Sequence, residues 1–234
     1  HSNSTFAAML MSVDESLGRL MAALKKHGLE GRTVIVFTSD NGGQSILSKP
    51  STSNLPLRGS KGWSYEGGIR VPAVIKWPGV TAPATVSDVP VCGIDFYPTL
   101  VDIAGLPAPG RESLDGTSLV PVLKGGTLPT RSLYWYFPSR HSGSPTTAAV
   151  RTGAHKLVLL QNGEVELYDV EHDIAERHNI ASRRPSVTES LKHSIHEWIA
   201  ASKEEATRNG VLTGKERTHA NAPGGRGGSR RHEE

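Results

Sequence analysis

The chain contains 234 residues, of which 36% are apolar, with 25 Gly, 15 Pro and one Cys. This composition is typical of a loop-rich protein and argues against a helical bundle, and a single cysteine excludes an internal disulfide. The net charge is +3, and +2 of it arises in residues 215–234, where five Lys or Arg face three Glu. We therefore expect no nucleic-acid-binding surface, and no membrane span either, because no run of about twenty apolar residues occurs.

The first predicted element is a helix over residues 5–27. Its end is marked by Lys25, Lys26, His27 and Gly28, since cations and a glycine favour a helix C-terminus. Apolar residues recur on one stripe at helical spacing, and we expect them to face a core: Met9, Val13, Leu17, Leu20, Met21 and Leu24.

A β-branched and aromatic run at residues 33–38 predicts a strand covered on both faces. After Ser39 come Asp40 and Asn41, and then two glycines. A carboxylate beside an amide carbonyl suits a hard divalent cation such as calcium, and Gly42 and Gly43 allow a close approach of the backbone. The alternative is an Asn-Gly hairpin turn, which would need a second strand directly after Gly43.

The remaining elements form two groups. Residues 95–104 are predicted to be a short helix, followed by a Pro- and Gly-rich connection through residue 130. Short strands are then expected at residues 133–137, 148–151, 156–160 and 164–169, as an antiparallel meander with an Asn162-Gly163 turn. A helix at residues 186–205 should pack on this sheet through Val187, Leu191, Ile195, Trp198 and Ile199.

These patterns predict three regions. Residues 1–130 form part of an α/β domain, and residues 131–208 form a small α+β subdomain. Residues 209–234 are rich in Gly and Arg and have too little apolar surface to order themselves.

Residues 57–72 read LRGSKGWSYEGGIRVP, and a strand-like AVIKWPG follows. Together with Asp40-Asn41-Gly42, this segment resembles the type I, formylglycine-dependent sulfatases, or arylsulfatases, of the alkaline-phosphatase superfamily. Further matches occur in the same order at residues 95–105, 114–119, 149–157 and 166–173. The resemblance extends from about residue 5 to about residue 182.

The resemblance implies an α/β fold that is part of an alkaline-phosphatase-like sandwich, with a small carboxyl-terminal α+β subdomain built of an antiparallel sheet plus a helix. It implies that Asp40 and Asn41 ligate a divalent metal, usually Ca2+, and that Lys61 is the catalytic, substrate-binding lysine that contacts the sulfate. A lysine ammonium can neutralise a sulfate oxygen and charge on the leaving group; the alternative for Lys61 is an ordinary solvated lysine. Arg58 and Arg70 could instead pair with Glu66 or another carboxylate and so fix the loop.

The nucleophile that the resemblance implies does not occur in the chain. Formylglycine is made from Cys or Ser in a C/S-x-P-x-R motif, which is absent, and the single cysteine, Cys92, lies in another context. The paired aspartates that complete the metal site of this family are also absent. We therefore interpret the chain as the carboxyl-terminal part of a sulfatase, inactive alone, whose formylglycine lies in an amino-terminal part.

Three functions remain open. The first is hydrolysis of sulfate monoesters by the intact parent, a sulfuric ester hydrolase acting on a sulfated small molecule or a sulfated glycan. The second is a phosphodiesterase or phosphonate monoester hydrolase of the same superfamily. The third is a non-catalytic, sulfated-glycan-binding remnant. The family resemblance alone favours a periplasmic or secreted location.

Overall fold

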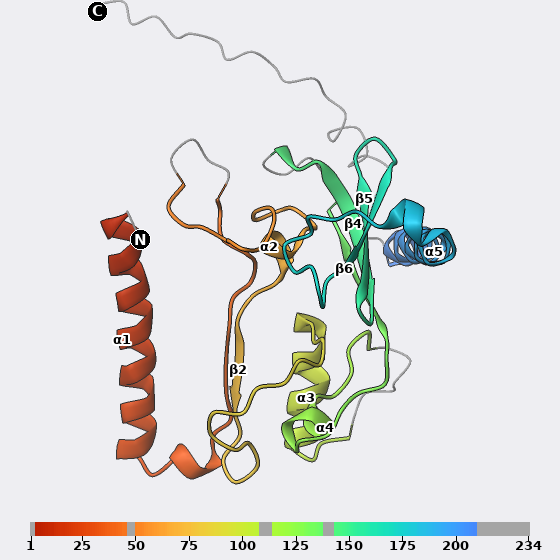
Figure 1. The fold of residues 1–234 in the computed structure, drawn as a ribbon. Coiled ribbons are helices and arrows are strands. Elements are labelled where there is room, and N and C mark those ends of the chain that lie inside the picture. The colour runs from red at the N-terminus through yellow and green to blue at the C-terminus, as the bar shows by residue number, and fades with distance from the viewer. Residues whose placement is uncertain (1–2, 46–49, 108–113, 138–142, 210–234) are drawn as a thin grey trace, which may run out of the picture.

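The computed structural model describes residues 3–45, 50–107, 114–137 and 143–209. Figure 1 shows helix α1 on one side, a strand pair with helix α3 in the middle, and a four-stranded sheet with helix α5 on the other side. Apart from Asn209, the predicted tail at residues 209–234 lies outside the described residues. Within the described ranges, no helix combines the length and apolar character that crossing a bilayer requires.

Helix α1 spans Ser4–Lys26, as predicted. The Asn3 side chain caps it by accepting a hydrogen bond from the Phe6 amide at 2.9 Å, and Gly28 follows its end at a φ of +66°. The prediction that its apolar stripe faces a core is wrong, because α1 has no buried residue. Met9, for example, is 61% exposed. Capping and propensity are local and suffice to form the helix, whereas burial of the stripe needs a packing partner.

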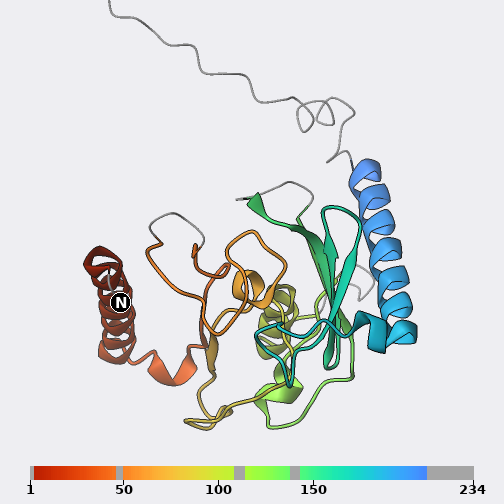
Figure 2. The ribbon, with the colours of Figure 1, turned by 45° about the horizontal axis from the view of Figure 1, so that its top comes forward.

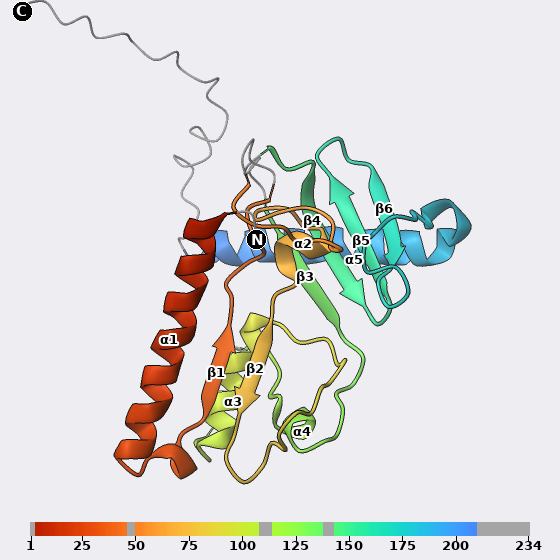
Figure 3. The same cartoon turned by 60° about the vertical axis from the view of Figure 1, so that its left-hand side comes forward.

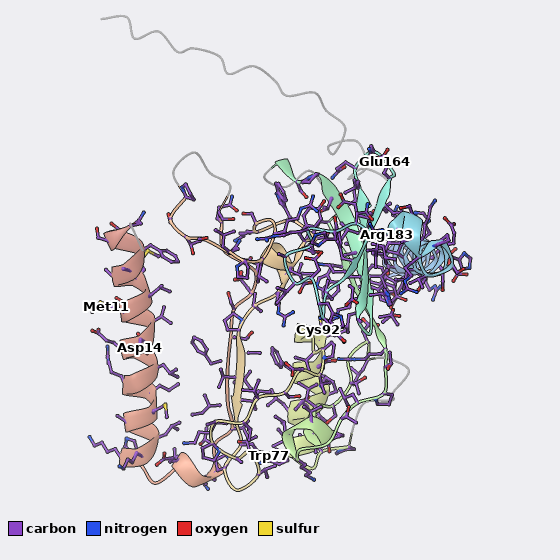
Figure 4. All side chains as sticks on the ribbon, viewed as in Figure 1. Met11, Asp14, Trp77, Cys92, Glu164 and Arg183 are labelled. Carbon is purple, nitrogen blue, oxygen red and sulfur yellow. The ribbon has the colours of Figure 1, made fainter. Side chains whose placement is uncertain are left out.

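Strand β1 (Ile35–Thr38) pairs antiparallel with β2 (Ala73–Lys76), with Ile35 opposite Lys76. The strand at residues 33–38 is therefore confirmed, but the prediction that both of its faces are covered is wrong: Phe37 is 38% exposed and Val74 is 60% exposed. Figures 1 and 3 place α1 and α3 on opposite sides of this pair. In Figure 4 the side chains crowd around the sheet and α5 but are sparse between α1, where Met11 and Asp14 are labelled, and the strand pair.

Three short elements follow β2: the 3-10 turn Gly93–Asp95, helix α3 (Phe96–Ile103) and helix α4 (Val120–Leu123). The predicted helix at residues 95–104 is thus confirmed. A further 3-10 turn at Glu30–Arg32 connects α1 to β1.

A buried carboxylate, Asp95, connects the start of α3 to the segments that precede α4 and β3. It is fully buried and forms a two-pronged ion pair with Arg131, one prong joining Nη1 to Oδ1 at 2.6 Å. Its oxygens also accept hydrogen bonds from the amides of Cys92 at 2.7 Å and Thr117 at 2.9 Å. A single side chain therefore joins α3, the segment before α4 and the entry to β3.

The predicted meander is confirmed. Its strands are β3 (Ser132–Tyr136), β4 (Thr146–Thr152), β5 (His155–Leu160) and β6 (Val165–Asp169), all antiparallel in the order β3-β4-β5-β6. Gly163 has a φ of +85° in the turn between β5 and β6, which a glycine adopts without strain.

Helix α5 (Pro185–Arg208) runs along one face of the sheet, preceded by a 3-10 turn at Ala181–Arg183 (Figure 2). Leu191 and Ile195 pack there against residues of the sheet that include Ala148, Val150, Leu157 and Leu167. Trp198, expected in the core, is half-buried and stacks on Tyr134 with ring centroids 4.9 Å apart. The helix predicted at residues 186–205 is confirmed, together with the face that it buries.

The opposite face of the sheet is covered by a loop from the first half of the chain. Tyr65 from this loop is 1% exposed and packs with Ala149, Val158, Tyr168 and Val170. Short helix α2 (Glu66–Ile69) continues the loop. The sheet is therefore a central layer between α5 and the segment that contains the glycines of the sequence motif.

Replacement of Asp95 should reveal how much its ion pair contributes to stability. Asp95→Ala is expected to lower the free energy of unfolding by about 3–5 kcal/mol, because Arg131 and two amides lose a buried acceptor. Urea unfolding followed by circular dichroism measures this change. The exposed Asp88 is the control: Asp88→Ala should change the same quantity by less than about 0.5 kcal/mol. Equal effects of both substitutions would contradict the role given to Asp95.

Candidate functional site

Two segments that are distant in sequence meet at the carboxyl end of β1. The first is the 40–43 segment, which contains Asp40 and Asn41, and the second is the Lys61 loop, defined as residues 58–68. The Gly42 amide donates to the Gly68 carbonyl at 3.0 Å, and the Lys61 amide donates to the Gly43 carbonyl at 3.2 Å. The backbone therefore brings together the segments that carry all three predicted site residues.

The Asn54 side chain clamps the same junction. Its Oδ1 accepts from the Gly43 amide at 3.0 Å, and its Nδ2 donates to the carbonyls of Gly43 at 2.7 Å and Gly59 at 3.1 Å. Ser60 Oγ also donates to the Gly43 carbonyl at 3.2 Å. The sequence reading did not single out Asn54, and its only local signal is a polar residue ahead of Leu-Pro.

The side chain of Lys61 is exposed, and no ion pair or hydrogen bond engages its ammonium among the described residues. Its three donors are thus available to an external anion. This holds equally for an ordinary solvated lysine, so the distinguishing observation is the position of its backbone beside the 40–43 segment.

Asp40 and Asn41 offer the kind of oxygen that a hard cation prefers. Asp40 is exposed, and Asn41 uses Nδ2 to donate to the Gly42 carbonyl at 3.1 Å, so its Oδ1 remains available. Ca2+ takes about six to eight oxygen ligands, and the described residues contain no group of three or more His, Cys, Asp or Glu that could hold a metal. The two donors are of the kind that calcium prefers, and a complete calcium site would need further oxygen ligands.

Both arginines of the motif pair with carboxylates. Arg70 Nη1 lies 3.2 Å from Glu66 Oε2. Arg58 Nη1 lies 3.5 Å from Glu166 Oε2 and donates to the Tyr168 hydroxyl at 2.6 Å, while its guanidinium lies 3.9 Å from the centre of the Tyr65 ring. These contacts give the arginines the loop-fixing role that the sequence left open.

A buried charge cluster lies on the far side of the Lys61 loop. Lys156 of β5 is fully buried, and its Nζ lies 2.8 Å from Glu66 Oε1 and 2.9 Å from Glu176 Oε1. Glu176 Oε2 accepts from the Glu66 amide at 2.7 Å. We call Glu66, Lys156 and Glu176 the buried cluster.

Sequence reasoning missed the buried cluster. In the alternating pattern of β5, Lys156 shares a face with Val158 and Leu160, but nothing local shows that the loop covers this face. Glu176 lies in an irregular segment at a φ of +53°. That value is uncommon for a residue with a side chain.

The pKa values of the two glutamates in the buried cluster are shifted in opposite directions. Burial alone would raise the pKa of Glu66, but the charge and hydrogen bond of Lys156, assisted by Arg70, hold that pKa below its ordinary value. Burial raises the pKa of Glu176, and Lys156 offsets this only in part.

Glycines allow the backbones to pack closely at the junction. A Cβ at Gly42 would lie 1.8 Å from the Gly67 carbonyl oxygen, and one at Gly68 would lie 2.1 Å from the Trp63 carbonyl oxygen. Because the opposing atoms belong to the backbone, no side chain can move aside to make room. At Gly42 and Gly68 a residue with a side chain would therefore not fit.

Comparison with known proteins gives consistent matches. Residues 1–106 match the family described as Sulfatase, and residues 60–205 match the family described as N-sulphoglucosamine sulphohydrolase, C-terminal. A protein named Sulfatase from Formosa agariphila is 35% identical over 225 residues, covering 85% of this chain and 40% of that protein. Human arylsulfatase A is 35% identical over 215 residues, covering 80% and 42%. The chain thus spans about two fifths of the length of these relatives.

Solved structures share the fold. Ps i-CgsB in complex with k-i-k-neocarrahexaose superposes with a TM-score of 0.72 at 29% identity, covering 82% of this chain and 42% of that one. BT4656 in complex with its substrate D-glucosamine-2-N,6-O-disulfate gives a TM-score of 0.63 at 26% identity, covering 83% and 40%.

The glycine packing can be tested by adding one methyl group. Gly68→Ala is expected to lower the free energy of unfolding by about 1–3 kcal/mol, because the added carbon overlaps backbone oxygens. Gly18 in α1 has nothing within 4 Å of its Cβ position, so Gly18→Ala should raise the same quantity by about 0.5–1 kcal/mol. Thermal or urea unfolding of both variants measures the difference, and a Gly68→Ala protein as stable as wild type would refute the close packing.

Proposed function

The chain belongs to the sulfatase family, and from this we propose that it supplies the anion-binding part of a sulfuric ester hydrolase. Lys61 contacts the sulfate, and Asp40 and Asn41 contribute two ligands to a Ca2+ ion. One observation supports the proposal: the 3.2 Å hydrogen bond from the Lys61 amide to the Gly43 carbonyl, which joins the backbone of Lys61 to the segment that contains Asp40 and Asn41.

The proposed chemistry is electrostatic. An exposed ammonium on a flexible stem can follow a tetrahedral anion and stabilise charge on the leaving oxygen. A divalent cation, when bound, supplies additional positive charge to the sulfate oxygens. The hydrogen bond to the Gly43 carbonyl holds the backbone of Lys61 in place, while its side chain remains free to move.

No residue of this chain fits the nucleophile. Formylglycine needs a C/S-x-P-x-R motif, and the single cysteine, Cys92, instead caps the 3-10 turn before α3. We therefore derive no covalent step from these residues, and we propose that the nucleophile comes from sequence outside the printed chain.

For the substrate we propose a sulfate monoester of a small molecule or a glycan. Two similar structures are described with a carbohydrate bound, and one of these ligands is a disulfated glucosamine. The phosphodiesterase or phosphonate hydrolase alternative is not favoured, because the named relatives are sulfatases. The third alternative, a remnant that binds sulfated glycans without turnover, is distinguished from a sulfatase by a turnover assay.

Replacement of Lys61 tests its role directly. In the complete gene product, Lys61→Ala is expected to lower kcat/KM for an aryl sulfate by about 100-fold or more, because one charge that stabilises the transition state is lost. Lys124, an exposed lysine at the end of α4, is the matched control, and Lys124→Ala should retain full activity. Sulfate binding without turnover by the unmodified protein would favour the binding remnant instead.

The metal prediction has a readout besides activity. Asp40→Ala is expected to weaken Ca2+ binding, measured by isothermal titration calorimetry, by about tenfold or more, because one charged ligand is removed. Asp14→Ala, which changes an exposed carboxylate on α1, should leave calcium affinity unchanged. Full calcium affinity in the Asp40→Ala protein would remove Asp40 from the ligand set.

A further inference from the structure

The Lys61 loop is held from two opposite sides. On one side, Gly68 and Lys61 bond to the 40–43 segment through the backbone. On the other side, the Ser64 amide donates to Thr146 Oγ1 at 2.8 Å, and Glu66 enters the buried cluster. A shift of the sheet relative to the loop would therefore be transmitted to the backbone of Lys61.

The buried cluster is the charged part of this attachment. Lys156 is 0% exposed, and the side chains of Glu66 and Glu176 are 4% and 0% exposed, so none of the three charges is solvated by bulk water. With the half-exposed Arg70 included, two cations face two carboxylates. The charges of these four side chains therefore balance.

Such a cluster is a poor device for stability alone. Apolar residues of similar volume often replace buried ion pairs at no cost, whereas removal of one partner leaves an uncompensated charge that is strongly unfavourable. A buried cluster does, however, restrict the arrangement of the segments that carry it, because Lys156 Nζ must stay close to both Glu66 and Glu176. Here that arrangement sets the distance between β5 and α2, and α2 is continuous with the Lys61 loop.

We propose that Lys156 is a positioning residue for Lys61: through Glu66 and Glu176, the carboxyl-terminal sheet holds the anion-contacting loop in register with the 40–43 segment. Lys156 itself does not touch the substrate. The inference rests on the proposed function in that Lys61 is taken to contact the sulfate, but the mechanical coupling can be measured without any substrate.

Backbone amide exchange tests the coupling. In Lys156→Met, deuterium uptake in peptides covering residues 58–68 is expected to accelerate by at least about tenfold, because the two glutamates lose their shared cation and the loop separates from the sheet. Glu176→Gln is a milder second variant that leaves Lys156 paired with Glu66. It should accelerate exchange in the same peptides to a smaller extent.

A matched control separates positioning from general loss of stability. Leu191 belongs to α5 and packs on the opposite face of the same sheet, against residues such as Val150 and Leu157. Leu191→Ala should lower the unfolding temperature, but it should leave the exchange of residues 58–68 relative to β4 unchanged. The positioning role is overturned if Lys156→Met and Leu191→Ala accelerate the exchange of residues 58–68, relative to β4, to the same extent. It is also overturned if Lys156→Met leaves that exchange unchanged.

A double-mutant cycle in the complete gene product then connects the coupling to turnover. Lys156→Met should lower kcat for an aryl sulfate at equal folded protein, and this loss should vanish in the Lys61→Ala background, because Lys156 acts through Lys61. Additive losses would overturn the proposal. Wild-type activity of Lys61→Ala would instead refute the proposed function of Lys61, and the exchange data would still decide whether Lys156 holds the loop.

Discussion

The ammonium of Lys156 between Glu66 and Glu176 is the interaction on which the arrangement of this protein depends. It is fully buried, and its two partners come from segments on different sides of β5 in the sequence. Because a buried charge is tolerated only with its partners in place, this contact ties the Lys61 loop to the carboxyl-terminal sheet. The apolar contacts of Tyr65 with Val158 and Tyr168 act in the same direction but tolerate small displacements.

The candidate site depends on this attachment because its own residues make few contacts. Asp40 and the side chain of Lys61 are exposed, so neither is held by packing. Their positions come from the backbone, through the close contact of Gly42 with Gly67 and Gly68 and the hydrogen bond from the Lys61 amide to the Gly43 carbonyl. When the polar groups of a site stay free for ligands, the loop that carries them must be supported by other contacts. Here the sheet supports the Lys61 loop on one face and packs against α5 on the other (Figure 2).

The two ends of the described structure differ in how they are stabilised. The sheet with α5 has two apolar layers and fully buried side chains such as Leu157 and Ile195. In contrast, α1 has no buried residue, and the pair β1–β2 leaves Phe37 and Val74 exposed. These elements form from capping, propensity and pairing. Their apolar faces contact no close-packed partner among the described residues, in a chain that spans about two fifths of the length of its relatives.

The sequence by itself determined the secondary structure, because caps, turn glycines and the periodicity of α5 and the meander are local signals. It also identified the family and brought Asp40, Asn41 and Lys61 to attention through their motifs. The periodicity of α5 also predicted the face that this helix buries. Only the tertiary structure decided that the α1 stripe is exposed and that Lys156 is buried on a face that periodicity would give to an apolar residue. The physical reason is that burial and pairing of charges depend on contacts between segments far apart in the chain, such as Glu66 with Lys156, which no local pattern encodes.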